Sequence, residues 1–320
     1  MKASRPRHRS PVRPLVRSLV RSPVRGLAAL GLAGVLAATG CSSSTGDGLA
    51  QREPTREPTT AASTDAAGVP EFDRYVALGD SYTSAPYVGN TDLAQGCLRS
   101  AANYPRLFAA QHEVGELVDV SCAGATTRDL GAGQHPFHGE VQVPPQFAAL
   151  TRDTDLVTVG IGGNDQDLFG QVAAACTRGA PSGRMSCAQA AATDVRPIGD
   201  NVEAALREVR RLAPDAAVVL VGYPRILEGR RCPSRLPVAP DGVAALTGLS
   251  QRLDAQLRRA ARAAGVDYLD VYAASEGHGV CSAQPWVNGA HSAPGRAAAL
   301  HPFAVEQQAV ADLLARALTR

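Results

Sequence analysis

The sequence predicts an α/β domain in which helices flank a parallel sheet. Short apolar runs alternate with segments of helical periodicity, as such a sheet requires. The last 250 residues also form one segment long enough for a single compact domain with a sizeable core. We expect strands at residues 75–78, 117–120, 155–159, 216–221 and 267–271. We expect helices near residues 100–112, 196–212, 242–264 and 303–318.

The first forty residues are expected to be a signal peptide of the lipoprotein type. Basic residues run through the first 25 positions and precede an apolar stretch at 27–38, which is too short to span a membrane. Small residues stand directly before Cys41, which resembles a bacterial lipobox, although Ala38 occupies the position where lipoboxes usually carry Leu. We therefore expect an exported protein, anchored on the outer face of the cell membrane by a lipid on Cys41 or simply secreted.

Residues 41–70 are expected to form a flexible tether ahead of a domain at 71–320. The segment is rich in Ser, Thr, Ala, Gly and Pro, and Arg-Glu-Pro-Thr occurs twice, at 52–55 and 56–59. Such a composition offers little apolar surface to bury.

The charge of the chain argues against nucleic acid as a partner. The full chain carries 32 basic and 30 acidic residues, but eight of the basic ones lie in the expected signal peptide and no acidic one does. The remainder therefore has 24 basic residues and a net charge of −6. A negative chain is not attracted to nucleic acid or to anionic lipid, so membrane attachment would rest on acyl chains.

Three turns that follow predicted apolar runs, and one segment near the C-terminus, carry residues suited to nucleophilic catalysis. Residues 79–82 read Gly-Asp-Ser-Tyr, so Ser81 follows a strand as a candidate nucleophile. Asn164 follows the strand at 155–159, Gly124 lies in the segment after 117–120, and His301 lies near the C-terminus. A serine needs a base and donors for the developing oxyanion, and ligands bind at the carboxyl ends of such strands.

The order Ser81, Gly124, Asn164 and His301 resembles the SGNH (GDSL-type) hydrolase family of esterases and lipases, over residues 71–320. The resemblance implies a three-layer α/β/α sandwich with a central, mainly parallel, five-stranded sheet of flavodoxin-like type. It also implies an ester hydrolase. We expect a monomer that needs no cofactor, and no metal because the sequence has neither a Cys-x-x-Cys pair nor a His-Glu-x-x-His motif.

The resemblance assigns roles to these residues. Ser81 attacks the ester carbonyl after His301 removes its proton, and the N–H groups of Ser81 and Gly124 with the Asn164 amide hold the oxyanion. The family usually places an acid three residues before the histidine, where this chain has Ala298. Secreted actinobacterial esterases with a Pro-Trp segment, as at 285–286, use a backbone carbonyl instead, so we expect the Ala298 carbonyl to orient His301.

Other residues remain open for these two roles. His278 and His291 lie in a loop that could approach the strand ends, so either could be the base. If a carboxylate orients the base, Asp267, Asp270 and Glu276 are the nearest candidates in sequence.

Cysteine usage indicates disulfides in an oxidising compartment. Apart from Cys41, the chain has an even number of cysteines and no metal-type Cys-x-x-Cys pair. Metal ligation is the alternative, and the sequence alone leaves the pairing open. The resemblance to secreted actinobacterial esterases implies pairing in sequence order, as Cys97–Cys122, Cys176–Cys187 and Cys232–Cys281.

Several other functions compete with an acyl esterase. A dinucleotide-binding oxidoreductase is disfavoured because the glycine turn after 155–159 has Asp165 in place of the third glycine. A noncatalytic envelope lipoprotein on a hydrolase scaffold has no need for all four site residues. A carbohydrate O-acetyl esterase is less favoured than one for acyl lipids or small esters, because aromatic residues make up only 4% of the chain and Trp286 is its single tryptophan.

Overall fold

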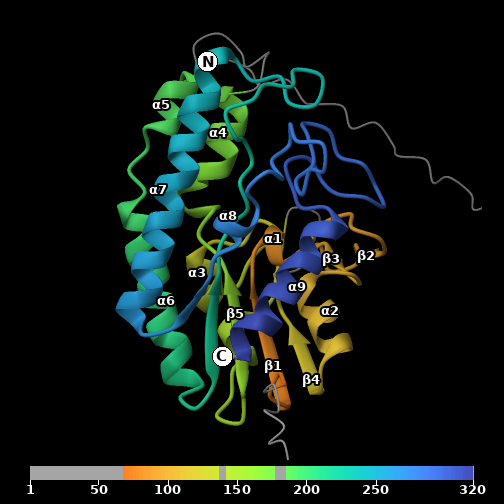
Figure 1. Ribbon diagram of the computed structural model, residues 1–320. Coiled ribbons are helices and arrows are strands. Elements are labelled where there is room, and N and C mark those ends of the chain that lie inside the picture. The colour runs from red at the N-terminus through yellow and green to blue at the C-terminus, as the bar shows by residue number, and fades with distance from the viewer. Residues whose placement is uncertain (1–67, 137–141, 177–184, 320) are drawn as a thin grey trace, which may run out of the picture. The chain divides into compact units, whose positions relative to one another are not determined.

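The computed structural model describes residues 68–136, 142–176 and 185–319 (Figure 1). The expected signal peptide, Cys41 and nearly all of the expected tether lie outside these residues. Among the helices of the described ranges, none is both long and apolar enough to cross a membrane.

Five parallel strands form the central sheet and confirm the predicted fold class. They are β1 (Phe72–Gly79), β4 (Val114–Asp119), β5 (Leu156–Gly160), β6 (Ala217–Val221) and β7 (Asp267–Leu269). Their order is β4-β1-β5-β6-β7, and every neighbouring pair is parallel. This is the flavodoxin-like order, in which the first strand lies inside the sheet and ligands bind at the carboxyl ends of the strands.

The helices vary greatly in length. The long ones are α6 (Arg196–Leu212), α7 (Pro240–Ala264) and α9 (Ala304–Leu318). The shorter ones are α1 (Ser81–Ser84), α2 (Tyr104–Gln111), α3 (Thr127–Ala132), α4 (Leu168–Cys176), α5 (Cys187–Ala191) and α8 (Val271–Ala274), with 3-10 turns at Gln146–Ala149 and Asp165–Asp167. A short antiparallel pair, β2 (Thr91–Asp92) and β3 (Arg99–Ser100), stands apart from the main sheet.

Helix caps shift one boundary of two predicted elements: the start of a helix and the end of a strand. The helix expected from residue 100 begins at Tyr104, where the Asn103 side chain accepts from the Arg106 N–H. The strand expected at 267–271 stops at Leu269, because Asp270 caps α8 by accepting from the Ala273 N–H.

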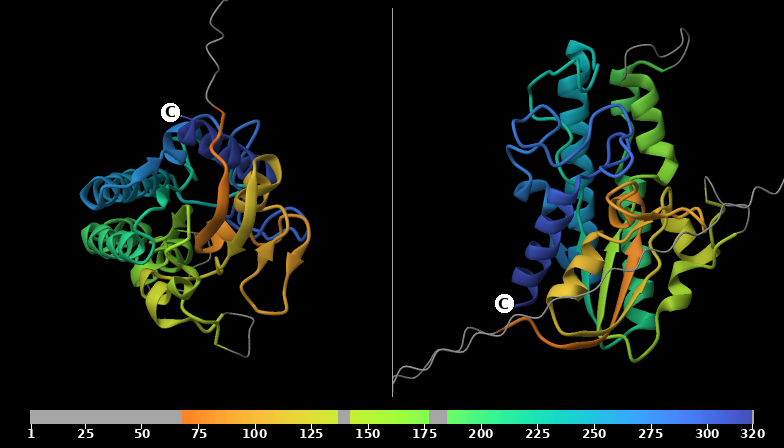
Figure 2. Two further views of the ribbon diagram at one scale, coloured as in Figure 1. Left: turned by 90° about the horizontal axis from the view of Figure 1, so that it is seen from below. Right: turned by 90° about the vertical axis from the view of Figure 1, so that its right-hand side faces the viewer.

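Alternating residues of β1 pack on the two faces of the sheet and divide the core into two layers. Val76 and Leu78 face a cluster with α6 and α7, whereas Tyr75 and Ala77 face a cluster with α2 and α9. Figure 2 shows these helix pairs on opposite sides of the sheet. The structure is therefore the three-layer α/β/α sandwich that the resemblance implied.

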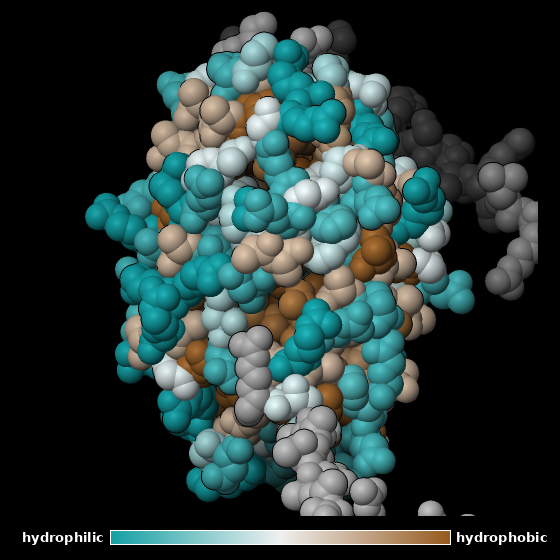
Figure 3. All heavy atoms as spheres, in the orientation of Figure 1, coloured by the Kyte–Doolittle hydropathy of each residue, from teal (hydrophilic) through white to brown (hydrophobic). Residues whose placement is uncertain are grey.

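Above the carboxyl ends of the strands, α4, α5, the first half of α7 and the long loop after α8 rise beyond the sheet (Figure 1). A third apolar cluster there, which includes Trp286 and Leu236, joins this loop to α7. The face drawn in Figure 3 is mostly hydrophilic, with apolar residues visible in patches between the polar ones. The parts above the sheet therefore bury apolar residues of their own and can enclose a site at the strand ends.

Candidate active site

Ser81 lies at the sharp turn after β1. Asp80 caps α1, with its Oδ1 accepting from the Tyr82 N–H at 2.8 Å, and Ser81 is the first residue of the helix. Gly79 cannot be replaced easily, since a Cβ there would lie 2.8 Å from the carbonyl oxygen of Gly160 on the neighbouring strand. Only 6% of Ser81 is exposed, and that residue lines a cavity at the strand ends. The turn therefore holds this serine at the edge of the sheet where ligands bind.

His301 lines the same cavity from the loop before α9. Its Nδ1 lies 2.7 Å from the carbonyl oxygen of Ala299, so the expectation that Ala298 supplies this carbonyl is wrong. Leu300 has a left-handed backbone, with φ of 61°, between Ala299 and the histidine. The Ala298 carbonyl instead accepts from the His301 N–H at 3.2 Å and from Asn288 Nδ2 at 3.0 Å.

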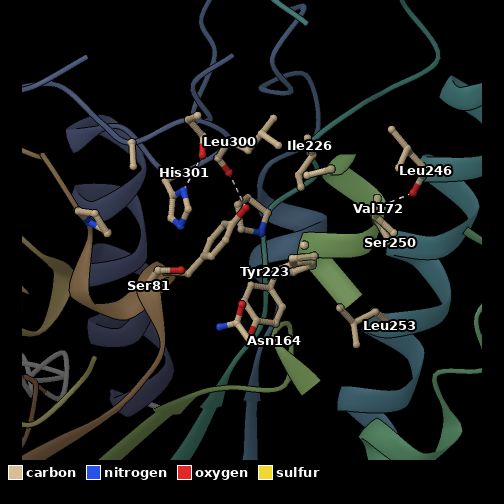
Figure 4. Close-up of a pocket in the computed structure, with 18 of the residues that line it drawn as sticks. Ser81, Asn164, Val172, Tyr223, Ile226, Leu246, Ser250, Leu253, Leu300 and His301 are labelled. Carbon is tan, nitrogen blue, oxygen red and sulfur yellow. Dashed lines mark hydrogen bonds between the residues drawn. The ribbon is translucent and has the colours of Figure 1, made fainter. Parts of the chain in front are cut away.

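The Ala299 contact fixes the proton on the imidazole. A carbonyl only accepts, so His301 Nδ1 must carry the hydrogen and Nε2 keeps its lone pair. Figure 4 shows the Ser81 hydroxyl on the side of the ring away from that carbonyl. Burial lowers the pKa of His301 below its ordinary value of 6.5. The ring is thus a neutral base at pH 7, turned toward the serine.

Three N–H groups suited to an oxyanion converge on this cavity, which Ser81, Gly124 and Asn164 all line. Gly124 has a backbone φ of 80°, which residues other than glycine rarely adopt. Asn164 Nδ2 donates one hydrogen to the Ala125 carbonyl at 3.0 Å, which leaves its second hydrogen available. Within the described ranges, no hydrogen bond uses the backbone N–H of Ser81 or of Gly124.

The two aspartates of these turns, Asp80 and Asp165, do not line the cavity, and their carboxyl groups accept hydrogen bonds from neighbouring segments instead. Asp165 accepts from the Thr127 N–H at 2.8 Å and from the Thr127 hydroxyl at 2.6 Å. Asp80 Oδ2 accepts from the Tyr223 hydroxyl at 2.5 Å, and burial raises the pKa of Asp80 to about 7. Tyr223 lines the cavity, and we did not foresee a role for it because no motif in the sequence marks it.

None of the carboxylates considered as partners of His301 contacts it. Asp270 pairs with Arg258, Glu276 lies 3.5 Å from Arg225, and Asp267 is exposed.

A buried carboxyl that we did not consider lies in the first turn of α9. Glu306 is 3% exposed and accepts from Gln307 Nε2 at 2.7 Å. Burial raises the pKa of Glu306 to about 8, so it is mostly protonated at pH 7. The sequence feature that could have drawn attention to Glu306 is its position five residues after His301.

The alternative histidines do not line the cavity. His278 stacks on Trp286 with 4.6 Å between ring centroids, and its Nδ1 lies 2.8 Å from the Gln284 carbonyl. His291 is exposed. His301 is thus the histidine that the structure brings to Ser81.

Three disulfides join Cys97–Cys122, Cys176–Cys187 and Cys232–Cys281, which are the pairs that the resemblance implied. In the described part of the chain, no group of His, Cys, Asp and Glu side chains is arranged to hold a metal ion. The Cys97–Cys122 disulfide lies beside the site, because the N–H groups of Ala123 and Ala125 donate to the carbonyls of Cys97 and Cys122. It therefore braces the turn that carries Gly124.

The cavity has a volume of about 450 Å³ and extends from Ser81 and His301 between α4 and α7. Figure 4 shows apolar side chains of these helices and of the loop after β6 on the side away from the serine. Residues that line this apolar part include Phe169, Val172, Ile226, Leu246, Leu249 and Leu253. The site thus combines a polar end at the strand turns with a long apolar extension.

Comparisons with known proteins agree with this geometry. Residues 77–304 match the GDSL-like Lipase/Acylhydrolase family. Lipase 2 of Streptomyces coelicolor is 37% identical over 274 residues, which cover 79% of this chain and 88% of that protein. A lipase of Streptomyces rimosus is 31% identical over 67% of this chain and 75% of its own.

Solved structures include two similar folds. Phospholipase A1 from Streptomyces albidoflavus NA297 superposes with a TM-score of 0.65 at 28% identity, covering 78% of this chain and all of that one. An extracellular lipase from Streptomyces rimosus gives a TM-score of 0.64 at 29% identity, covering 76% and 98%. With its sequence, strand order and site in agreement, the chain belongs to the GDSL-like lipase/acylhydrolase family and is a hydrolase of ester bonds.

Proposed function

We propose that this protein is an exported serine esterase or lipase that hydrolyses acyl esters through a Ser81 acyl-enzyme. The observation that carries the proposal is the apolar cavity that opens directly beside Ser81 and His301. The names of the relatives, lipases and a phospholipase A1, support the same substrate class.

The proposed mechanism uses only groups of this chain. Ser81 Oγ attacks the carbonyl carbon while His301 Nε2 takes the hydroxyl proton. The N–H groups of Ser81 and Gly124 and the Asn164 amide stabilise the oxyanion. Collapse of the intermediate breaks the ester bond, and the leaving alcohol takes the proton from His301. Water, deprotonated by the same histidine, then attacks the acyl-enzyme and releases the acid.

The apolar lining favours acyl chains of medium to long length. Each methylene that leaves water stabilises a complex by about 0.8 kcal/mol, or roughly fourfold in an equilibrium constant. The rate constant kcat/KM should therefore rise with chain length until the cavity is filled. A sugar acetate would bring a short acyl group and many hydroxyls, which the apolar side chains between α4 and α7 cannot satisfy. An acyl esterase is thus a better match than a carbohydrate O-acetyl esterase.

The mechanism is tested on the domain of residues 71–320 with a series of acyl esters. Ser81→Ala and His301→Ala should each lower kcat by about 10⁴-fold or more, because each removes a reacting group. Activity should be unaffected by a chelator. Hydrolysis that survives Ser81→Ala at the wild-type rate would overturn the mechanism.

A second experiment tests the acyl site. Leu253→Trp, deep in the cavity, should reduce kcat/KM for long acyl esters while sparing short ones. The matched control is Leu93→Trp, at a leucine that is 58% exposed. An unchanged chain-length profile in Leu253→Trp would place the acyl chain elsewhere.

We further propose that the chain works outside the cytoplasm as a monomer, held to the membrane by a lipid on Cys41 or released. The three disulfides support an oxidising compartment. Metabolic labelling with a fatty acid, compared between wild type and Cys41→Ala, tests lipidation. Gel filtration of the purified domain tests the oligomeric state.

A further inference from the structure

We propose that Tyr223 is a positioning residue that sets the spacing of the oxyanion donors, by joining the turn of Ser81 to the turn of Asn164 through one hydroxyl group. This inference rests on the proposed mechanism and goes beyond it, since Tyr223 lies outside the four residues that carry the resemblance.

The hydroxyl of Tyr223 makes two hydrogen bonds to two different turns. It donates to Asp80 Oδ2 at 2.5 Å and accepts from the Gly163 N–H at 2.9 Å. Asp80 precedes Ser81, and Gly163 precedes Asn164. The last backbone bond between these two segments runs from the Asp80 N–H to the Gly160 carbonyl at 2.9 Å. The phenol oxygen adds a second connection, beyond the end of the sheet, between the turns that follow β1 and β5.

The Asp80 carboxyl group passes this constraint on to the nucleophile. While its Oδ2 accepts from the phenol, its Oδ1 accepts from the Tyr82 N–H at 2.8 Å and so orients the first turn of α1. The Ser81 N–H belongs to that turn and has no intrahelical partner. A shift of Asp80 would thus move an oxyanion donor and the attacking oxygen together.

The other two donors are tied to the same assembly. Asn164 Nδ2 donates to the Ala125 carbonyl at 3.0 Å, next to Gly124. The turn of Gly124 is also tied to the end of β1, because the Cys122 N–H donates to the Gly79 carbonyl at 2.9 Å. Within this connected assembly, the phenol of Tyr223 is the side-chain link between the turn of Ser81 and the turn of Asn164. Because oxyanion stabilisation depends on donors held in advance of the reaction, a loose link costs rate rather than substrate affinity.

The ring of Tyr223 is held in place by its neighbours. It meets Tyr82 edge-on at 5.0 Å between centroids and Phe169 at 5.3 Å, and only 8% of the residue is exposed. Hydrogen bonds in such a buried environment are stronger than the same bonds in water. Removing the hydroxyl alone should leave this packing intact, which makes Tyr223→Phe a selective test.

The experiment compares Tyr223→Phe with the control Tyr75→Phe, which also removes a buried hydroxyl but one bonded to Thr158 away from the cavity. Tyr223→Phe should lower kcat by roughly 10- to 100-fold, less than complete loss of one donor, with KM within about threefold. Tyr75→Phe should keep kcat within about threefold even if its stability falls.

Inhibitor binding separates positioning from a merely structural role. An alkyl boronic acid forms a tetrahedral anion with Ser81, whereas a fatty alcohol of the same length only fills the cavity. In Tyr223→Phe the inhibition constant of the boronic acid should rise by about the same factor as kcat falls. That of the alcohol should stay within about threefold, because the apolar lining is unchanged.

A second variant covers poor folding of the first. Asp80→Asn replaces the carboxyl oxygen that accepts from the phenol with an amide nitrogen. The double variant with Tyr223→Phe should cost little more than either single change, as expected for two members of one link. The inference is overturned if Tyr223→Phe keeps wild-type kcat and boronic acid affinity, or if the two changes are fully additive. A failure of the proposed mechanism is distinguishable, because it would appear as an active Ser81→Ala variant.

Discussion

The two walls of the active site are built in different ways. The oxyanion wall consists of turns that directly follow β1 and β5, together with the turn of Gly124, so the sheet itself brings these residues together. The histidine wall is a long loop without regular strands, and it is held at the site by hydrogen bonds and by the apolar cluster that joins it to α7. The position of a turn after a strand can be predicted from sequence, whereas the contacts that orient a loop residue such as His301 cannot.

The histidine loop is held by pairings that join residues close to His301 with the segment around Trp286. Phe303 N–H donates to the Trp286 carbonyl at 2.7 Å, and Asn288 N–H donates to the His301 carbonyl at 2.9 Å. The Tyr82 hydroxyl adds a bond of 2.7 Å to the Leu300 carbonyl. Each bond is an ordinary neutral one, worth about 1 kcal/mol, so several are needed to fix the imidazole.

The largest effect is expected on the oxyanion wall. Asn164→Ala should lower kcat by roughly 10²- to 10³-fold, as loss of one oxyanion donor does, with little change in KM. Asn201→Ala is the matched control, since Asn201 bonds to Asp165 at 3.1 Å but does not line the cavity. Steady-state measurement of kcat and KM for both variants on one acyl ester tests this prediction. Equal losses in both variants would mean that Asn164 acts only through the turn.

A smaller effect is expected on the histidine wall. Tyr82→Phe removes the bond to the Leu300 carbonyl and should lower kcat by about tenfold, because the Ala299 carbonyl then holds His301 less firmly. The ring contact of 5.3 Å between Tyr82 and His301 is retained. A loss as large as that of Asn164→Ala would show that the loop has no other adequate support.

The carboxyl groups considered as partners of His301, together with Glu306, should matter still less. We expect Asp267→Asn, Asp270→Asn, Glu276→Gln and Glu306→Gln each to keep kcat within about tenfold at pH 7, since none of these groups bonds to His301 and Glu306 is already mostly protonated. Neutralising a true triad acid can cost about 10⁴-fold. A collapse of that size, with the melting temperature unchanged, would reveal an acid on the histidine wall.

The pH profile should give the smallest effect. Burial keeps the pKa of His301 below 6.5, so the imidazole is mostly the neutral base at pH 7 and less than half protonated at pH 6.5. The acidic limb of kcat/KM should therefore have its midpoint below pH 6.5, with less than a twofold loss at that pH. A midpoint above 7 that persists in Asp80→Asn, whose wild-type pKa is about 7, would show that the ring is held by a negative charge rather than by a carbonyl.

Prediction from sequence succeeded where a local pattern implies a place in the fold. The apolar runs located all five strands, and the turns after them placed Ser81, Gly124 and Asn164 around one cavity. Strand ends were less certain, since the cap at Asp270 shortened the last strand. The catalytic roles of these residues stay predictions until the kinetics are measured.

The sequence by itself determined the fold class, the family and the residue types of the site, because periodicity and short motifs are local properties. Only the tertiary structure decided that Ala299 rather than Ala298 faces His301, that Glu306 is buried, and that Tyr223 joins two turns. Each of these depends on contacts between residues far apart in the chain or on one left-handed residue, Leu300, in a loop. Neither the long-range contacts nor the left-handed residue produces a periodic pattern in the sequence, because side-chain contacts across a fold are set by packing rather than by spacing along the chain.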